Sequence, residues 1–306
     1  MNIDYERHVL KWVRDPTAIR ALMENYARDR RITGGDKDGF HVLSEDGEKL
    51  HRFRGLLTPL AECFWPQLLN PAVVAAATKR VKKLSKQPGP RALKTKPKYQ
   101  SAQQAVKGRQ RGSLVHLQIQ QLVTMQTADF MHEHPEGAHP WAVDIPEYLE
   151  RKKGWRPVCS EKRVFDERLG MATSIDLVYT DYTGMLHFIE VKTGYATAAE
   201  WLAETMGPMR GPLAGALKNN TLNRAMLQCI AGAMMAVEGY GIEHEFGCWV
   251  LHKSENGITL DGADTEVMTL LIPVLYDTLL RHHLERKARK RKIKKEKKTR
   301  RVPKLL

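Results

Sequence analysis

The order of apolar and polar positions predicts a β-hairpin in the middle of the chain. Residues 177–179 and 186–189 are mostly apolar runs of strand length, and residues 181–184 between them are typical of a turn. A helix is predicted at 222–235, where apolar residues recur three and four positions apart, and a further strand at 245–252. Strands and helices in this order favour an α/β fold.

Further elements are predicted on both sides of this hairpin. Residues 39–43 and 46–53 predict a second hairpin around a Ser-Glu-Asp-Gly turn. Helical periodicity predicts helices at 113–127 and at 270–284, each with an apolar side. Residues 1–35 also have a helical pattern, in which we find no chemistry.

Charged residues lie within the central hairpin, where buried strands normally exclude them. Asp176 interrupts the first apolar run, and Glu190 and Lys192 interrupt the second. Because an unpaired buried charge is costly, such groups persist if they are paired or bind a metal. Alternation along a strand places Glu190 and Lys192 on one face, and the antiparallel partner brings Asp176 beside Glu190. Oxygen ligands of this kind suit Mg²⁺ or Mn²⁺.

The spacing of these residues resembles the core of the PD-(D/E)XK nuclease superfamily. Asp176, a gap of 13 residues and then Glu190-Val191-Lys192 match that pattern. Thr193-Gly194 after the lysine resembles the RecB-type branch. The segment Arg111-Gly112-Ser113-Leu114-Val115-His116 resembles the first motif of that branch, a glycine followed by a histidine. The layout of residues 39–260 is similar to that of the mitochondrial genome maintenance exonuclease and its phage and viral relatives.

The resemblance implies a fold and an activity. The fold implied is an α/β restriction-endonuclease-like core, with a mixed central sheet flanked by helices and with α-helical N-terminal additions. The activity implied is that of a metal-dependent deoxyribonuclease with Mg²⁺ or Mn²⁺ as cofactor, acting on DNA as an exonuclease on single-stranded ends in replication, repair or recombination. We expect an N-terminal helical extension at 1–38, the nuclease domain at 39–284 and a basic tail at 285–306.

The resemblance also implies a role for individual residues. The expected catalytic residues are Asp176, Glu190 and Lys192. The expected metal ligands are His116, Asp176, Glu190 and the backbone carbonyl of Val191. The expected substrate-binding residues are Gln228, Thr193, Arg109 and Arg111. Glu161, on the strand before Asp176, either supports the metal ligands or is a paired surface glutamate.

Several alternatives remain open at this level. His116 can also be read as a histidine that caps a core cluster. RecB-type nucleases usually carry a Gln-x-x-x-Tyr helix after the lysine strand, but here Gly232 occupies the tyrosine position after Gln228. A catalytically inactive nucleic-acid-binding protein that keeps the fold is therefore one alternative. A nuclease that acts on RNA is another, because phosphate contacts do not distinguish the sugars.

Positive charge is concentrated in two parts of the 306-residue chain, whose formal net charge is +14. Residues 63–128 contain twelve Lys or Arg and no acidic residue, and residues 286–304 contain thirteen with a single Glu. Such clusters are typical of proteins that bind polyanions. The Pro and Gly content of the insertion at about 79–111 predicts a loop beside the active site. The tail is expected to be helical or disordered, and to bind DNA or act as a nuclear import signal.

The remaining composition excludes several classes of protein. No run of about 18 apolar residues predicts a membrane span, and the N-terminus lacks the pattern of a secretory signal. Four cysteines without CxxC spacing argue against a zinc or iron–sulfur site and favour an intracellular, reducing location. We expect the nucleus in a eukaryotic host and otherwise the cytoplasm or nucleoid. Because the chain has no P-loop, unwinding would require a separate helicase or polymerase. No pattern indicates an oligomeric state.

Overall fold

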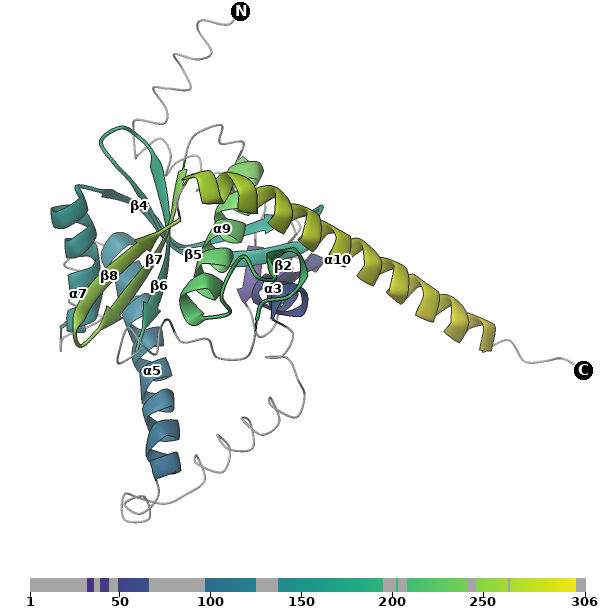
Figure 1. Cartoon of the computed structure of the whole chain (residues 1–306), viewed down its shortest axis with the longest axis horizontal. Coiled ribbons are helices and arrows are strands. Elements are labelled where there is room, and N and C mark those ends of the chain that lie inside the picture. Colours follow the sequence, from purple (N-terminus) through teal and green to yellow (C-terminus); the bar gives the residue numbers. More distant parts are fainter. Residues whose placement is uncertain are drawn as a thin grey trace, which may run out of the picture.

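The computed structural model describes residues 32–35, 39–43, 49–65, 97–124, 137–194, 202, 208–240, 246–263 and 265–300. Within these ranges, eight strands form one open sheet with helices on both faces (Figure 1). Some neighbouring strands are parallel and others antiparallel. The predicted α/β class, with a mixed central sheet flanked by helices, is confirmed.

The strand order positions three strands side by side at the centre. The order is β1-β2-β3-β5-β6-β7-β8, and β4 pairs with β5 outside this path. The N-terminal strands are β1 (Ile32–Gly35), β2 (Gly39–Leu43) and β3 (Lys49–Gly55). The central strands are β4 (Arg156–Asp166), β5 (Met171–Thr180) and β6 (Leu186–Thr193). The last two are β7 (Phe246–Ser254) and β8 (Gly257–Gly262).

The predicted central hairpin is formed by β5 and β6. These strands are antiparallel, with Leu177 opposite Ile189 and Thr180 opposite Leu186. The Asp181 carboxylate organises the turn, because it accepts hydrogen bonds from the backbone N–H groups of Thr183 at 2.8 Å and of Met185 at 3.1 Å. The hairpin of β2 and β3 is also observed as predicted.

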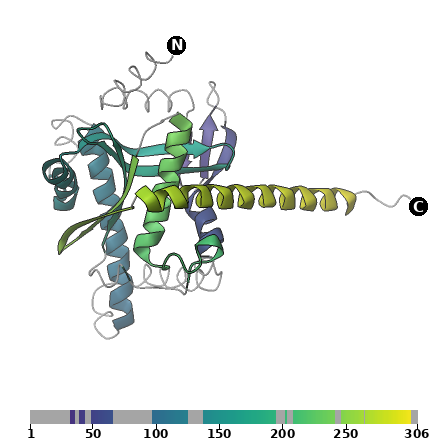
Figure 2. The ribbon, with the colours of Figure 1, turned by 45° about the horizontal axis from the view of Figure 1, so that its top comes forward.

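Helices on one face of the sheet enclose the larger hydrophobic core. They are α3 (Leu57–Phe64), α9 (Thr221–Tyr240) and α10 (Thr265–Arg300). From the sheet, Val178 and Phe188 face this core, where Leu227 and Ile230 of α9 are fully buried. Figure 2 shows α10 crossing α9 and then extending far beyond the sheet.

Other helices cover the opposite face. They are α5 (Pro97–Thr124), α7 (Pro140–Glu147) and the π-helical turn η3 (Tyr148–Lys152). Val115 and Ile119 of α5 pack with Leu177 and with the strand residues Ile189 and Val191. Phe188 faces one core and Ile189 the other, as alternation along a strand requires.

Two predictions about secondary structure are wrong in part. The N-terminal extension was predicted to be helical, but residues 32–35 form β1, because the β-branched Ile32 and Thr33 pair with the edge of β2. The basic insertion was predicted to be a loop, but residues 97–111 belong to α5. Pro97 is compatible with this because a helix tolerates proline at its first position. Residues 1–31 and 66–96 lie outside the described residues.

The helix predicted at 270–284 is longer than expected. It begins at Thr265 and continues through the basic segment to Arg300, so no structural boundary lies at residue 285. The physical reason is that residues 285–300 contain neither Gly nor Pro and are rich in Lys and Arg, which are good helix formers. Among the helices that the structure describes, none is long and apolar enough to cross a bilayer.

Candidate metal centre

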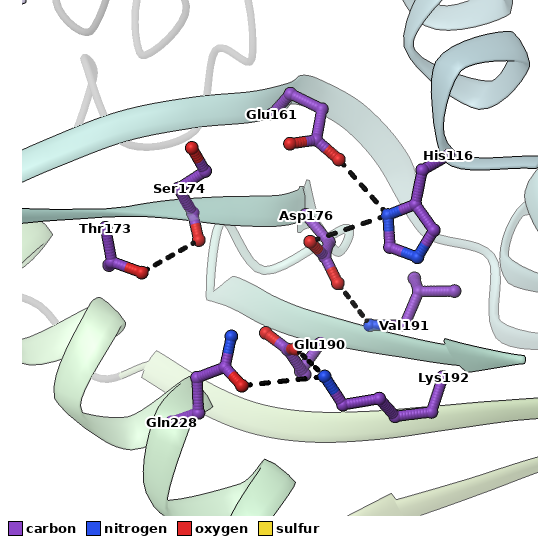
Figure 3. A network of polar contacts seen from close by, with 9 residues as sticks. All are labelled: His116, Glu161, Thr173, Ser174, Asp176, Glu190, Val191, Lys192 and Gln228. Carbon is purple, nitrogen blue, oxygen red and sulfur yellow. Dashed lines mark hydrogen bonds and ion pairs between the residues drawn. The ribbon is translucent and has the colours of Figure 1, made fainter. Parts of the chain in front are cut away.

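Asp176 lies at the point where the pairing of β5 and β6 ends. On β5, the residues from Thr180 back to Leu177 pair with β6, and Asp176 is the next residue before them. Its Oδ2 accepts a hydrogen bond from the backbone N–H of Val191 at 2.7 Å (Figure 3). The side chain thereby takes over the role of a ladder carbonyl, and the carboxylate is fixed between two strands.

His116 reaches the same point from α5. Packing of Val115 and Ile119 against the sheet orients this turn of the helix. The Nδ1 atom of His116 lies 3.1 Å from Oε1 of Glu161 and 3.6 Å from Oδ1 of Asp176. One ligand atom from each of His116, Glu161 and Asp176 lies within 4.8 Å of the other two. A helix and two neighbouring strands therefore converge on a space that a divalent cation could occupy.

Glu161 is more central than the sequence indicated. Its neighbours Ser160 and Lys162 pair with Leu177 and Ile175, so β4 carries Glu161 alongside Asp176. Among the described residues it is the one non-glycine residue with positive φ, at 48°. Left-handed backbone costs a residue with a side chain about 1–2 kcal/mol, and such strain is often found at functional sites. Glu161 is half-buried and its partner is His116, so the pairing itself places it beside Asp176.

Glu190, which is buried, and Lys192, which is half-buried, form an ion pair beside this group. As predicted, their side chains lie on one face of β6, and Nζ of Lys192 donates to Oε1 of Glu190. The Glu190 residue is only 4% exposed. Nζ of Lys192 also lies 3.5 Å from Oε1 of Gln228 on α9. Figure 3 shows Lys192 directed toward both oxygens, so the residues expected from the lysine strand and from α9 do come together.

Negative charge accumulates in this part of the protein. Burial, and secondarily the charge of Asp176, raises the pKa of Glu190 to about 7 despite the nearby Lys192. For His116, burial alone would lower the pKa, but Asp176, Glu161 and Glu190 outweigh it and raise the pKa to about 9. The shift of His116 opposes the effect of burial, so the nearby carboxylates favour a positive charge at this position.

The donor set fits a divalent cation. It combines one imidazole nitrogen with carboxylate oxygens, a combination compatible with Mn²⁺ and, through its oxygens, with Mg²⁺. The carbonyl of Val191 faces the same side of β6 as its N–H, since the two groups of one strand residue point together. Glu190 lies outside the His116–Glu161–Asp176 group and is paired with Lys192 instead.

The other expected substrate-binding residues lie along α5 and the end of β6. A Cβ atom on Gly112 would be 2.8 Å from Oγ1 of Thr193, so the glycine permits close contact with that side chain. Arg111 pairs with Glu255 at 2.8 Å and lies 4.0 Å from the centre of a Trp141 ring. Arg109 belongs to α5, but its side chain is outside the described part of the chain.

A second histidine–aspartate pair in the sheet has a structural role. Nε2 of His187 lies 3.2 Å from Asp181, and Trp249 donates to Nδ1 at 3.1 Å. The ring of Trp155 stacks on His187 at 3.9 Å between centroids. Burial lowers the pKa of His187, and both ring nitrogens are engaged. Both histidines lie near carboxylates, but His187 has an aspartate and a tryptophan on its two ring nitrogens, whereas His116 faces two carboxylates.

Comparison with known proteins does not identify the chain. No family model matches it, and no curated protein matches it. Membership of the PD-(D/E)XK superfamily therefore remains a prediction that depends on the motifs described above.

Proposed function

We propose that this protein is a divalent-metal-dependent nuclease that hydrolyses DNA phosphodiester bonds, with a restriction-endonuclease-like core. The observation that carries the proposal is the position of Asp176, held by the Val191 backbone on one side and facing His116 and Glu161 on the other. The ion pair between the buried Glu190 and the half-buried Lys192 lies alongside. A cation site next to an ammonium group is an arrangement that can support hydrolysis of a phosphodiester, because the metal activates water and both charges stabilise phosphate oxygens.

The residues around Asp176 have distinct proposed roles. His116, Glu161 and Asp176 would hold Mg²⁺ or Mn²⁺, with the Val191 carbonyl and Glu190 as the other candidate ligands. A bound divalent cation would lower the pKa of a water molecule and neutralise charge on the phosphate oxygens.

Lys192 and Gln228 would act on the substrate side of the site. Nζ of Lys192 would donate a hydrogen bond to the attacking water or to a phosphate oxygen, and Gln228 would keep Nζ in position. Glu190, with its pKa of about 7, could accept a proton at its carboxylate near neutral pH. Thr193, Arg111 and Arg109, which follow Lys192 or precede His116, are the proposed phosphate contacts.

The finer features of the proposal rest on the sequence. Similarity to end-processing nucleases supports exonuclease action on single-stranded ends in DNA replication, repair or recombination. The two basic stretches support DNA as the partner, and the absence of a P-loop supports a separate helicase or polymerase. The four cysteines without CxxC spacing support an intracellular location, with the nucleus in a eukaryotic host, where the basic tail would be an import signal, and the cytoplasm or nucleoid otherwise.

One observation favours a rival function, that of a nucleic-acid-binding protein without catalysis. Gly232 occupies the position of the usual tyrosine, and its Cβ would lie 3.4 Å from Ile175 and 3.6 Å from Thr173. The glycine thus brings α9 close to β5, and a tyrosine would not fit without movement of the strand. The departure from the usual Gln-x-x-x-Tyr pattern favours the rival.

A cleavage assay separates these functions. End-labelled single-stranded, double-stranded and circular DNA, and RNA of the same sequence, would be incubated with Mg²⁺, Mn²⁺ or EDTA. We expect metal-dependent release of label from single-stranded DNA ends, and a loss of at least about 100-fold in Lys192→Ala. Lys218→Ala, a change at an exposed lysine, is the matched control.

Each other result has a defined meaning. Binding without cleavage by the wild type in any metal would reject the nuclease and support the rival function. Cleavage of circular DNA would replace exonuclease by endonuclease action. Preferential cleavage of RNA would reassign the substrate.

A further inference from the structure

The C-terminal part of α10 is a cationic helix that the rest of the described structure leaves uncovered. Leu275 and Leu279 are fully buried, whereas Leu284 is 55% exposed and Ile293 is 45% exposed. Between these last two, all but one of the residues from Glu285 to Lys292 are exposed. Both views show this part of α10 extending away from the sheet (Figures 1 and 2). Packing on the sheet therefore cannot be what maintains this part as a helix.

Charge alone disfavours a free helix of this composition. Residues 286–294 include seven Lys or Arg and no acidic residue. Positions 287, 290, 291 and 294, which lie three and four apart, therefore present like charges on one face. Like charges at this spacing destabilise a helix. A polyanion bound along the helix would remove the repulsion and favour the helical form.

The base of this helix is also cationic. Arg54 donates to both oxygens of Glu62 at 3.0 and 2.8 Å, and Nε2 of His282 lies 2.7 Å from the same carboxylate. The Glu62 carboxylate thus already contacts two basic side chains, Arg54 and His282. Arg286 lies near Arg54 and Glu62 as a third basic group. Among the described residues, the buried Nη1 of Arg286 has no hydrogen-bond partner. Burial and the charge of Arg54 lower the pKa of Arg286, as expected in a positive potential.

We propose that the helix from Arg286 to Arg300, together with its base at Arg54 and His282, is a binding surface for duplex nucleic acid, separate from the metal centre. This deepens the proposed function: the surface would hold the duplex part of a substrate whose single-stranded end is cleaved. The helix spans about 22 Å at 1.5 Å per residue. A helix of this kind fits the major groove of a duplex, where basic helices contact phosphates on both sides.

Binding measured in EDTA tests this surface independently of cleavage. The arm variant replaces Lys287, Lys290, Arg291 and Lys294 by Gln, which is also a good helix former. The control variant replaces four exposed cations at the opposite end of the molecule by Gln, namely Arg151, Lys152, Lys153 and Arg156. The two variants have equal net charge. Fluorescence anisotropy with a labelled duplex, from 50 to 300 mM salt as a rough range, would give affinity and salt dependence.

We expect the arm variant to bind duplex on the order of 100-fold more weakly near 0.1 M salt, with a salt slope smaller by about 3 to 4. The control variant should behave as the wild type. Addition of duplex should increase amide-exchange protection of residues 286–300 in the wild type. Circular dichroism of both variants without DNA would show that each is folded.

Several results would overturn the proposal. Equal binding by all three proteins would show that the helix does not contact nucleic acid, and equal weakening of both variants would show attraction by net charge alone. Loss of binding to vesicles of anionic phospholipid, with duplex binding unchanged, would make the surface a membrane contact. Because none of these measurements requires cleavage, an inactive wild type would reject the nuclease and leave this surface standing.

Discussion

Asp176 and Val191 are joined by a hydrogen bond in which a carboxylate oxygen substitutes for a strand carbonyl, 2.7 Å from the backbone nitrogen. The same side chain therefore has a structural and a proposed chemical function. Asparagine at this position should separate the structural function from the chemical one. Its amide oxygen can still accept the hydrogen bond from Val191 but binds a cation weakly.

The first prediction concerns replacements of Asp176. Asp176→Asn should keep the Val191 hydrogen bond and the fold of the metal-free protein, yet bind Mn²⁺ about 10–100-fold more weakly and lose cleavage. Asp176→Leu should destabilise the protein by about 1–3 kcal/mol, because it leaves the Val191 N–H buried without an acceptor. Urea denaturation in EDTA and calorimetric titration with Mn²⁺ measure these quantities. Equal Mn²⁺ affinity of wild type and Asp176→Asn would exclude Asp176 as a ligand.

The second prediction concerns the strained backbone of Glu161. With φ at 48°, Glu161→Gly should be more stable than Glu161→Ala by about 1 kcal/mol, since only glycine adopts this conformation freely. Both variants should bind Mn²⁺ about 10–100-fold more weakly, because both lose the carboxylate. The comparison of the two variants isolates backbone strain from ligand loss. If Mn²⁺ affinity is unchanged in both, Glu161 only orients His116.

The third prediction concerns the pH dependence of stability without metal. The pKa of Glu190 is raised to about 7 and that of His116 to about 9, so each protonated group favours the folded state. The contribution of Glu190 is present below its ordinary value of 4.5 and is lost as pH rises through about 7. That of His116 is present below 6.5 and is lost as pH rises through about 9.

The expected result is a free energy of unfolding that decreases from about pH 5 to about pH 9 in EDTA. Mn²⁺ should stabilise the protein more at pH 8 than at pH 6, because it competes with protons for the same groups. Glu190→Gln should remove the part of the decrease below neutral pH. Denaturation curves that coincide over this whole range would show that neither group is perturbed.

The fourth prediction concerns the contact between Gly112 and Thr193. Gly112→Ala should destabilise the protein by about 1 kcal/mol, although alanine normally stabilises a helix, because its Cβ would lie 2.8 Å from Oγ1. In the Thr193→Ala background the same change should be neutral or stabilising. A double-mutant cycle in urea measures this coupling, and additive effects would mean that Thr193 moves away without cost.

The local elements of the fold could be predicted from the sequence, but the partners of the central residues could not. Alternation and turn chemistry at 177–189 define the hairpin, and alternation alone places Glu190 and Lys192 on one face. The neighbour of Asp176 on β4 depends on a register that shifts between Pro157 and Cys159. Such a register shift cannot be recognised from the sequence of β4 alone. The sequence therefore did not predict that Glu161 lies beside Asp176 and His116.

The errors at the ends of helices have a similar origin. Proline was taken as evidence for a loop before residue 111, but at Pro97 it begins a helix instead of interrupting one. Short strands are equally hard to predict, because the four residues of β1 acquire their conformation from pairing with β2. In both cases the conformation depends on residues outside the segment: on the helix that follows Pro97, and on the strand that pairs with β1.

The first half of the strand that carries Glu190 and Lys192 is enclosed on both sides. From Leu186 to Ile189, β6 pairs with β5 along one edge and with β7 along the other, and it continues beside β7 to Thr193. Amide hydrogens in such a strand exchange with solvent only when most of the molecule opens. The slowest exchange rates of residues 186–189 would therefore give the global stability of the protein directly.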